Sequence, residues 1–151
     1  MMLEDKNFIK YLNPQGRILD VGSLDVNGNI KHCCNGLYIG VDIRKGKNVD
    51  IQASSHNLPF KSEIFDSIIS VGTLEHDDAF WLSIEEMKRV LKIGGRLILS
   101  IPNYKFKIHK HPQDYWRFSE DAVQILFNRF NEVSFWKPKV NDDCLRIWGI
   151  K

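Results

Sequence analysis

The stretch Arg17-Ile-Leu-Asp-Val-Gly-Ser-Leu-Asp-Val-Asn-Gly28, followed by Leu37-Tyr-Ile-Gly-Val-Asp42, decides the fold. Each part begins as an apolar strand, and the second strand ends in a carboxylate. Asp42 follows Gly22 by 20 residues, the separation expected when the ribose of a nucleotide reaches the tip of the neighbouring parallel strand. Glycine lets the backbone approach a ligand closely, and a carboxylate accepts from both ribose hydroxyls. The pattern predicts a site for a nucleoside-containing cofactor; the alternative is an ordinary strand-to-loop turn with a solvated aspartate.

The turn itself distinguishes between cofactors. A dinucleotide site favours Gly-x-Gly-x-x-Gly, because the amides of a helix N-terminus then hold the pyrophosphate. Here the glycines fall at Gly22 and Gly28, and the turn carries two acids, Asp20 and Asp25. Carboxylates so close to a pyrophosphate would repel it, whereas they suit a ligand that carries an ammonium and a sulfonium. The turn therefore disfavours a nicotinamide-dependent oxidoreductase.

Composition and charge fit a single compact domain, which we expect to span residues 1–151. The 151 residues are 43% hydrophobic and 26% charged, and a chain of this length buries roughly two thirds of its unfolded surface. A net charge of +2 without a basic run gives no reason to expect nucleic acid or a membrane as partner. No signal peptide and no long apolar stretch are visible, so we expect a cytoplasmic protein. A homodimer is compatible with the sequence.

The cysteines indicate neither a disulfide framework nor a metal site. There are three, and two of them, Cys33 and Cys34, are adjacent. His32 precedes them, but neighbouring side chains rarely converge on one tetrahedral ion. We therefore expect no bound metal.

Apolar patterning predicts alternating helices and strands. Expected helices cover Met2–Leu12, Asp78–Leu91 (ended by Gly94-Gly95) and a segment capped by Ser119, and expected strands cover Ile18–Val21, Leu37–Ile43, Val49–Ala53 (weaker), Phe65–Val71, Arg96–Ile101, Val133–Lys137 and Leu145–Ile150. Near-continuous apolar strands are typical of a parallel sheet covered on both faces. The sum is a three-layer α/β domain with a mostly parallel sheet and an antiparallel hairpin at one edge.

The order of motifs resembles a class I S-adenosylmethionine-dependent methyltransferase of the small type 11 kind. The matching segments are Ile18-Leu-Asp-Val-Gly-Ser23, Tyr38-Ile-Gly-Val-Asp42, Asn57-Leu-Pro-Phe60, Phe65-Asp66, Leu74-Glu-His76, Arg89-Val-Leu-Lys-Ile-Gly-Gly95 and Asp114-Tyr-Trp-Arg-Phe118. The resemblance implies a Rossmann-like methyltransferase fold, S-adenosyl-L-methionine as cofactor and methyl transfer to a small-molecule acceptor. No motif identifies that acceptor.

The resemblance also implies roles for single residues on the cofactor side. Asp20 would hold the ammonium of the methionine part, which would lie against the backbone of Gly22 and Ser23. Asp42 would bind the ribose hydroxyls, and Ile43, Ser54 and Ser55 would surround the adenine. Ser54 stands where the family commonly has an aspartate, and Leu24 stands at a frequent glycine site. These departures leave open the alternative that the chain is a noncatalytic relative, which kept the fold as a binding or subunit-interaction module.

The acceptor side has several candidates and an open alternative for each. A base is required only if the acceptor must lose a proton; His76, His111 and Tyr115 are our catalytic candidates, with His109 and Asp114 nearby. His76 can equally be a residue that holds a loop. Tyr104, Trp116 and Arg117 lie in the aromatic segment 103–118 and are candidates for acceptor binding. Alternatively, the aromatics pin this loop onto the sheet, with Arg117 in a structural salt bridge.

Overall fold

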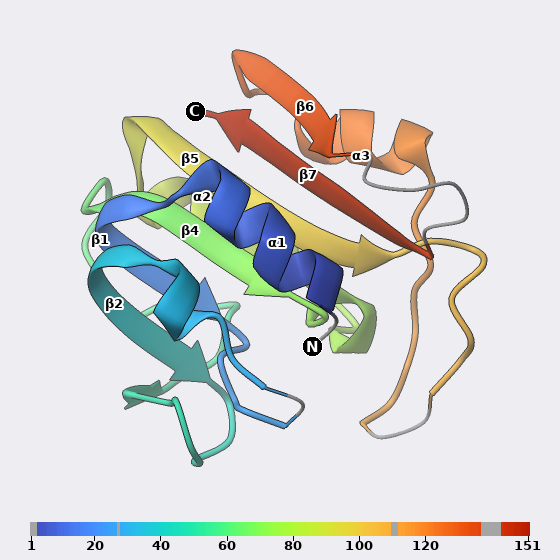
Figure 1. Cartoon of the computed structure of the whole chain (residues 1–151), viewed down its shortest axis with the longest axis horizontal. Coiled ribbons are helices and arrows are strands. Elements are labelled where there is room, and N and C mark those ends of the chain that lie inside the picture. Colours follow the sequence, from blue (N-terminus) through green and yellow to red (C-terminus); the bar gives the residue numbers. More distant parts are fainter. Residues whose placement is uncertain (1–2, 27, 110–111, 137–142) are drawn as a thin grey trace.

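Seven strands form one sheet in the computed structural model, which describes residues 3–26, 28–109, 112–136 and 143–151 (Figure 1). The order across the sheet is β3-β2-β1-β4-β5-β7-β6. The strands are β1 (Gln15–Val21), β2 (Asn35–Asp42), β3 (Ile51–Gln52), β4 (Phe65–Val71), β5 (Leu91–Pro102), β6 (Glu132–Trp136) and β7 (Cys144–Ile150). The first five are parallel, whereas β7 runs antiparallel to both β5 and β6. The predicted mostly parallel sheet with an antiparallel edge hairpin is confirmed.

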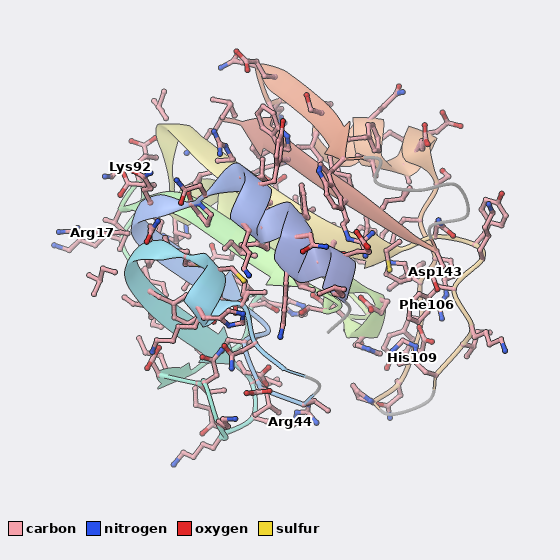
Figure 2. The ribbon with its side chains drawn as sticks, in the orientation of Figure 1. Arg17, Arg44, Lys92, Phe106, His109 and Asp143 are labelled. Carbon is pink, nitrogen blue, oxygen red and sulfur yellow. The ribbon has the colours of Figure 1, made fainter. Side chains whose placement is uncertain are left out.

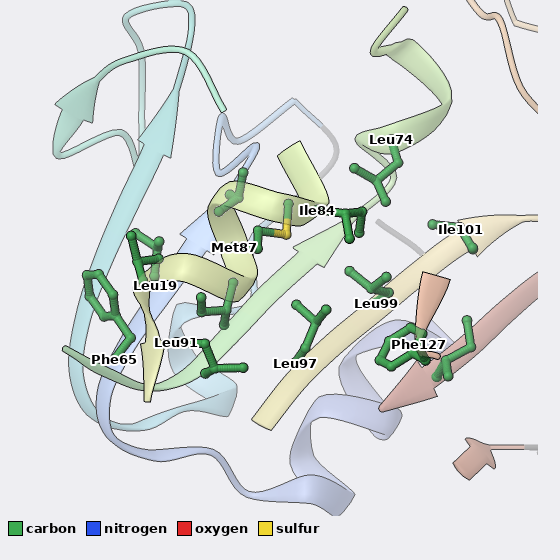
Figure 3. Close-up of a cluster of buried hydrophobic side chains, with 14 of the residues drawn as sticks. Leu19, Phe65, Leu74, Ile84, Met87, Leu91, Leu97, Leu99, Ile101 and Phe127 are labelled. Atoms are coloured by element: carbon green, nitrogen blue, oxygen red, sulfur yellow. The ribbon is translucent and has the colours of Figure 1, made fainter. Parts of the chain in front are cut away.

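Helices cover both faces of the sheet, as the nearly continuous burial of the central strands requires. They are α1 (Leu3–Leu12), α2 (Phe80–Val90) and α3 (Glu120–Leu126), with single turns η1 (Lys31–Cys33) and η2 (Leu74–His76). In β1, Ile18 packs into the core beneath α1, and Leu19 packs into the opposite core with Ile84 and Met87 of α2 (Figure 3). The three-layer α/β prediction is therefore confirmed. Among the described residues, no helix has the length and apolar character needed to cross a membrane.

The end of α2 differs from the prediction. The helix stops at Val90, and Leu91 already belongs to β5 and is fully buried. Gly94 has φ of 77° within this strand, and the pairing with β4 shifts between Phe65 and Ser67. The glycines thus form an irregularity in a strand rather than a helix end, because the left-handed conformation of Gly94 lets the extended chain bulge without leaving the sheet.

The start of α3 agrees with the prediction. The Ser119 hydroxyl accepts a hydrogen bond of 3.1 Å from the Ala122 amide, as an N-cap does. The helix ends at Leu126, and Phe130, which lies beyond it, packs on Phe127 with ring centroids 4.8 Å apart.

A buried ion pair ties α1 to the antiparallel edge of the sheet. Arg146 of β7 donates from Nε to Asp5 Oδ1 of α1 at 2.8 Å, and the Ser100 hydroxyl of β5 donates to the same oxygen at 2.7 Å. Asp5 is 3% exposed and Arg146 is 1% exposed. Because charges this deep are costly without a partner, either residue alone would destabilise the fold.

We predict that Arg146→Met lowers the free energy of unfolding by about 3–5 kcal/mol, because it leaves the buried Asp5 carboxylate without its cation. Urea unfolding followed by circular dichroism measures this loss. The double variant Asp5→Leu/Arg146→Met removes both charges and is expected to recover a large part of it. A single-variant loss below about 1 kcal/mol, the level of an exposed pair, would contradict the role assigned to this pair.

Candidate functional site

A cavity of about 700 Å³ opens at the carboxyl ends of β1, β2 and β4. Strand order reverses at β1, which pairs with β2 on one side and with β4 on the other, and ligands of open parallel sheets bind at such a point. The residues predicted from sequence that line the cavity are Asp20, Gly22, Ser23, Asp42, Ile43, Ser54, Ser55 and His76. Tyr104, Tyr115, Trp116 and Arg117 are not among its lining residues, and His111 lies outside the described residues.

Asp20, the residue before the last one of β1, lines the cavity and is 5% exposed. Asn48 Nδ2 donates to the Tyr38 hydroxyl at 2.8 Å, so the proton of Tyr38 is free to point at Asp20 Oδ2, to which it donates. Burial raises the pKa of Asp20 to about 7; the bond from Tyr38 lowers this pKa and the charge of Asp42 raises it. Burial likewise raises the pKa of Tyr38. A carboxyl group whose pKa lies near neutral pH therefore faces the cavity.

The turn after β1 needs glycine because the chain passes close to the end of β4. Gly22 has φ of 83°, and a Cβ at this position would lie 2.1 Å from Thr73 Oγ1. The amides of Gly22 and Ser23 both donate to the Val41 carbonyl, at 2.8 and 3.0 Å. The Ser23 hydroxyl is buried and has no hydrogen-bond partner among the described residues. The turn thus offers a ligand a close backbone approach and one unused hydroxyl rather than free amides.

Asp42 is held in a fixed orientation at the tip of β2. The Leu24 amide donates to Oδ2 at 3.3 Å, and the Arg44 amide donates to Oδ1 at 2.8 Å. Each carboxylate oxygen has a second lone pair, so both remain able to accept from a diol. Ile43 beside it is 67% exposed at the cavity mouth.

Asp25, the second acid of the turn, does not line the cavity. Its oxygens accept from the Gly28 amide and from Asn29 Nδ2, both at 2.9 Å, and lie 3.1 Å from Lys47 Nζ. These bonds, that of Asn29 first, lower the pKa of Asp25. Asp25 therefore braces the loop instead of facing a cationic ligand. Glycine at position 46 makes room for Leu24, because a Cβ on Gly46 would lie only 2.2 Å from Leu24 Cδ1.

The loop after β3 carries the two serines. Ser54 Oγ accepts from the His56 amide at 3.2 Å, and Ser55 Oγ accepts from Ser83 Oγ of α2 at 2.7 Å. Both hydroxyls are thereby positioned, and each retains a lone pair. His56 also lines the cavity, with Nε2 2.7 Å from Asp77 Oδ1.

Two histidines from separate segments meet on the far side of the cavity. His76 Nε2 lies 3.1 Å from His109 Nε2, and His76 Nδ1 lies 2.7 Å from the Gln113 carbonyl. Figure 2 shows His109 and Phe106 on the long loop between β5 and α3. Glu75, which sequence reasoning did not select, lines the cavity beside them at 3% exposure, and burial raises its pKa to about 7. The sequence feature that could have identified Glu75 is its place in Leu74-Glu-His76, one of the segments that carry the family resemblance. His76 thus holds the loop and faces the cavity at once.

The residues around Trp116 hold this loop in place. Trp116 Nε1 donates to the Asp77 carbonyl at 2.8 Å, and the Tyr115 amide donates to the Glu75 carbonyl at 2.7 Å. Arg117 makes a bidentate pair with Asp114, at 2.5 and 2.6 Å, which lowers the pKa of Asp114 to about 2. These contacts favour the structural alternative for Trp116 and Arg117.

Comparisons with known proteins agree with this geometry. A family model described as a methyltransferase domain, of type 11, matches residues 7–99. "Probable tRNA methyltransferase 9B" of Mus musculus is 30% identical over 135 residues, which are 82% of this chain and 28% of that protein. An uncharacterised protein of Methanocaldococcus jannaschii is 35% identical over 121 residues, 72% of this chain and 57% of the relative. The chain therefore spans about a quarter to a little over half of these relatives.

Solved structures share the fold. An S-adenosylmethionine-dependent methyltransferase of Thermotoga maritima, a possible histamine N-methyltransferase, superposes with a TM-score of 0.76 at 21% identity, over 99% of this chain and 88% of that one. The 1,6-didemethyltoxoflavin-N1-methyltransferase of Burkholderia thailandensis, solved with bound S-adenosylhomocysteine, gives 0.75 at 15% identity, over 99% and 77%. Given the family match over residues 7–99, this chain belongs to the class I S-adenosylmethionine-dependent methyltransferases, in the type 11 methyltransferase domain family.

Proposed function

We propose that this chain transfers the methyl group of S-adenosylmethionine to a small-molecule acceptor. The observation that carries the proposal is that one cavity joins the acids Asp20 and Asp42 to a histidine pair that faces the same space. Its volume of about 700 Å³ lies within the ~300–1,000 Å³ typical of small-molecule sites. An acceptor can therefore enter beside the donor.

The residues present fit the donor. Asp20 provides a buried carboxylate for its ammonium, the unpaired Ser23 hydroxyl lies beside it, and Asp42 offers two oriented oxygens to the ribose hydroxyls. Ser54 and Ser55 would lie at the adenine, with Ile43 against its ring. When bound, S-adenosylmethionine supplies an electrophilic methyl group on a positively charged sulfur. The chain's own task is chiefly to align an acceptor with that group, because alignment supplies much of the acceleration in such a displacement.

The acceptor side is the wall formed by η2 and the loop after β5. Phe106 and Pro112 give this wall apolar surface, and His76 and His109 give it polar atoms. The Gln113 carbonyl fixes the proton of His76 on Nδ1, since a carbonyl can only accept. The Nε2 atom of neutral His76 then carries a lone pair 3.1 Å from His109 Nε2, where it can accept a proton from that ring or, in its place, from an acceptor. Tyr115 stays a catalytic candidate although it is not among the residues that line the cavity, and His111, which lies outside the described residues, stays one as well.

Labelling with a radioactive donor tests the acceptor class. The protein is incubated with labelled S-adenosylmethionine and, separately, with the small-molecule fraction and the total tRNA of a cell extract. Label in a low-mass product supports the proposal, and label in tRNA alone overturns it. Donor binding without transfer in any fraction would favour the noncatalytic alternative.

Asp42→Ala is expected to weaken the binding of S-adenosylhomocysteine at least about tenfold, because two charge-assisted hydrogen bonds to the ribose are lost. Isothermal titration calorimetry measures the change. Glu85→Ala, on the exposed face of α2, is the matched control and should bind as the wild type does. Unchanged affinity in the Asp42 variant would remove this residue from the site.

Asp20 predicts a pH dependence of donor affinity. Its pKa in the free protein is about 7, and pairing with an ammonium requires the ionised form, so affinity should rise by up to about tenfold per pH unit below 7 and level off above it. Because the pKa of Asp20 is higher in the folded than in the unfolded protein, ionisation of Asp20 destabilises the fold. Its contribution to the free energy of unfolding is fully present below about pH 4 and is lost as pH rises from about 4 to about 7. Calorimetry between pH 5.5 and 8.5 should show a flatter profile for Asp20→Asn; equal slopes would contradict the assignment.

Arg117→Ala separates the two interpretations of the aromatic loop. Because the Asp114 side chain is fully buried, loss of its guanidinium partner should lower the melting temperature and weaken donor binding together. Acceptor contact alone would instead slow transfer, with stability unchanged and donor affinity within about twofold. Exposed Arg129→Ala serves as the control for loss of an arginine.

A further inference from the structure

Glu75, His76 and His109 form a cluster whose ligand atoms all lie within 4.8 Å of one another. Each residue offers a good donor to a divalent transition metal: one carboxylate oxygen and two imidazole nitrogens. Glu75 and His76 come from the turn η2, and His109 comes from the loop after β5, so the cluster exists only because these two segments meet. It faces the cavity, which all three residues line.

The two rings meet through their Nε2 atoms, and the tautomer of His109 decides what those atoms offer a ligand. His76 Nδ1 must carry a proton to bond the Gln113 carbonyl at 2.7 Å, so Nε2 of neutral His76 carries a lone pair. Asp114 Oδ2 lies 3.2 Å from His109 Nδ1, but Nδ1 has no hydrogen-bond partner among the described residues, so the proton of neutral His109 can sit on either nitrogen. With the proton on Nε2, His109 donates to His76 across 3.1 Å; with the proton on Nδ1, both Nε2 atoms offer lone pairs to the space between them. In the second tautomer, one cation can be bound by both Nε2 atoms.

The distances in the cluster are compatible with ligands of one metal ion. With Zn–N bonds of about 2.05 Å, two nitrogen ligands lie about 2.9–3.3 Å apart for angles between 90° and tetrahedral, and the two Nε2 atoms are 3.1 Å apart. Glu75 Oε1 is 3.9 Å from His76 Nε2, so a small side-chain shift brings it into the set. Glu75 Oε2 is buried without a hydrogen-bond partner among the described residues. The cluster therefore has an unused buried oxygen for a cation.

The surrounding residues resemble the outer shell of a metal site. Ligating histidines usually present their second nitrogen to a carbonyl or a carboxylate, which fixes the ring. His76 has the Gln113 carbonyl in this position. Asp114, held by Arg117, lies 3.2 Å from His109 Nδ1, which makes no hydrogen bond among the described residues and needs only a small ring rotation to reach it. The neighbouring group of His56, Asp77 and Asp78 lacks this arrangement, because His56 Nε2 bonds Asp77 directly, and Asp77 also accepts from the Ala79 amide and Ser83.

We propose that Glu75, His76 and His109 bind one divalent transition metal ion, such as Zn²⁺, with open coordination toward the cavity. Three protein ligands with an open position are the pattern of catalytic rather than structural zinc. There the ion would take a hydroxyl, thiol or carboxylate of the acceptor as a further ligand and lower the pKa of an acidic proton on it. Only this role in acceptor activation rests on the proposed function; metal binding itself does not.

The test is a titration of the chelator-treated protein with Co²⁺ alone, without donor, followed by visible absorption, and then displacement by Zn²⁺. We expect one ion per chain and a visible band without strong near-ultraviolet thiolate absorption. His109→Ala and His76→Ala should each weaken binding at least about hundredfold, and Asp114→Asn about tenfold to hundredfold. His109→Ala is decisive, because its ring is 41% exposed and circular dichroism can verify that the variant remains folded.

Two matched variants separate this site from others. His56→Ala changes the neighbouring cluster, and His32→Ala changes the exposed histidine beside Cys33; both should bind Co²⁺ as the wild type does. Absence of stoichiometric binding to the wild type overturns the proposal. Binding that persists in His109→Ala, that is lost in either control, or that shows thiolate absorption overturns it as well. Because S-adenosylhomocysteine affinity is measured separately, failure here is distinct from failure of the donor site.

Discussion

Parallel pairing of β1 with both β2 and β4 is the constraint on which the site depends. Leu19 of β1 lies opposite Ile39 on one side and Ile68 on the other, so the three strands end at the same edge of the sheet. Their turns open to one space because strand order diverges at this point. A slip of β1 by one residue would exchange its two faces, turning Asp20 away from the cavity and Ile18 out of its core. The register of hydrophobic side chains therefore also sets the chemistry.

Burial sets the electrostatics of this space. Water is scarce around Asp20 and Glu75, and burial raises the pKa of each to about 7. Such acids are costly to ionise alone and are stabilised when a cation arrives. Asp114 is the contrast: it is buried too, but the Arg117 hydrogen bonds lower its pKa to about 2. Asp114 thus stabilises the structure as a charged carboxylate, whereas Asp20 and Glu75 are able to bind a cationic partner.

The extent to which sequence predicted the fold follows from how local each signal is. Both bounds of β4 are as predicted, because every residue of Phe65–Val71 lies in a sheet covered on both faces. The start of β1 was missed, since Gln15, Gly16 and Arg17 are exposed and carry no apolar pattern. The end of α2 was misplaced because glycine marks a helix end and a strand bulge equally well. Pairing with β4 decided between them.

By itself, the sequence determined which residues of the proposed donor half lie together: Asp20, Gly22 and Asp42 belong to one strand-turn-strand unit, whose geometry is fixed over a short stretch of chain. Tertiary structure alone decided the acceptor half. His76 and His109 are 33 residues apart, and their meeting depends on how the loop after β5 is held against η2. Sequence could name Trp116 and Arg117 but not the direction of their side chains, because long-range packing sets that direction. Spacing along a chain specifies contacts within a unit, whereas contacts between units form only when burial brings their surfaces together.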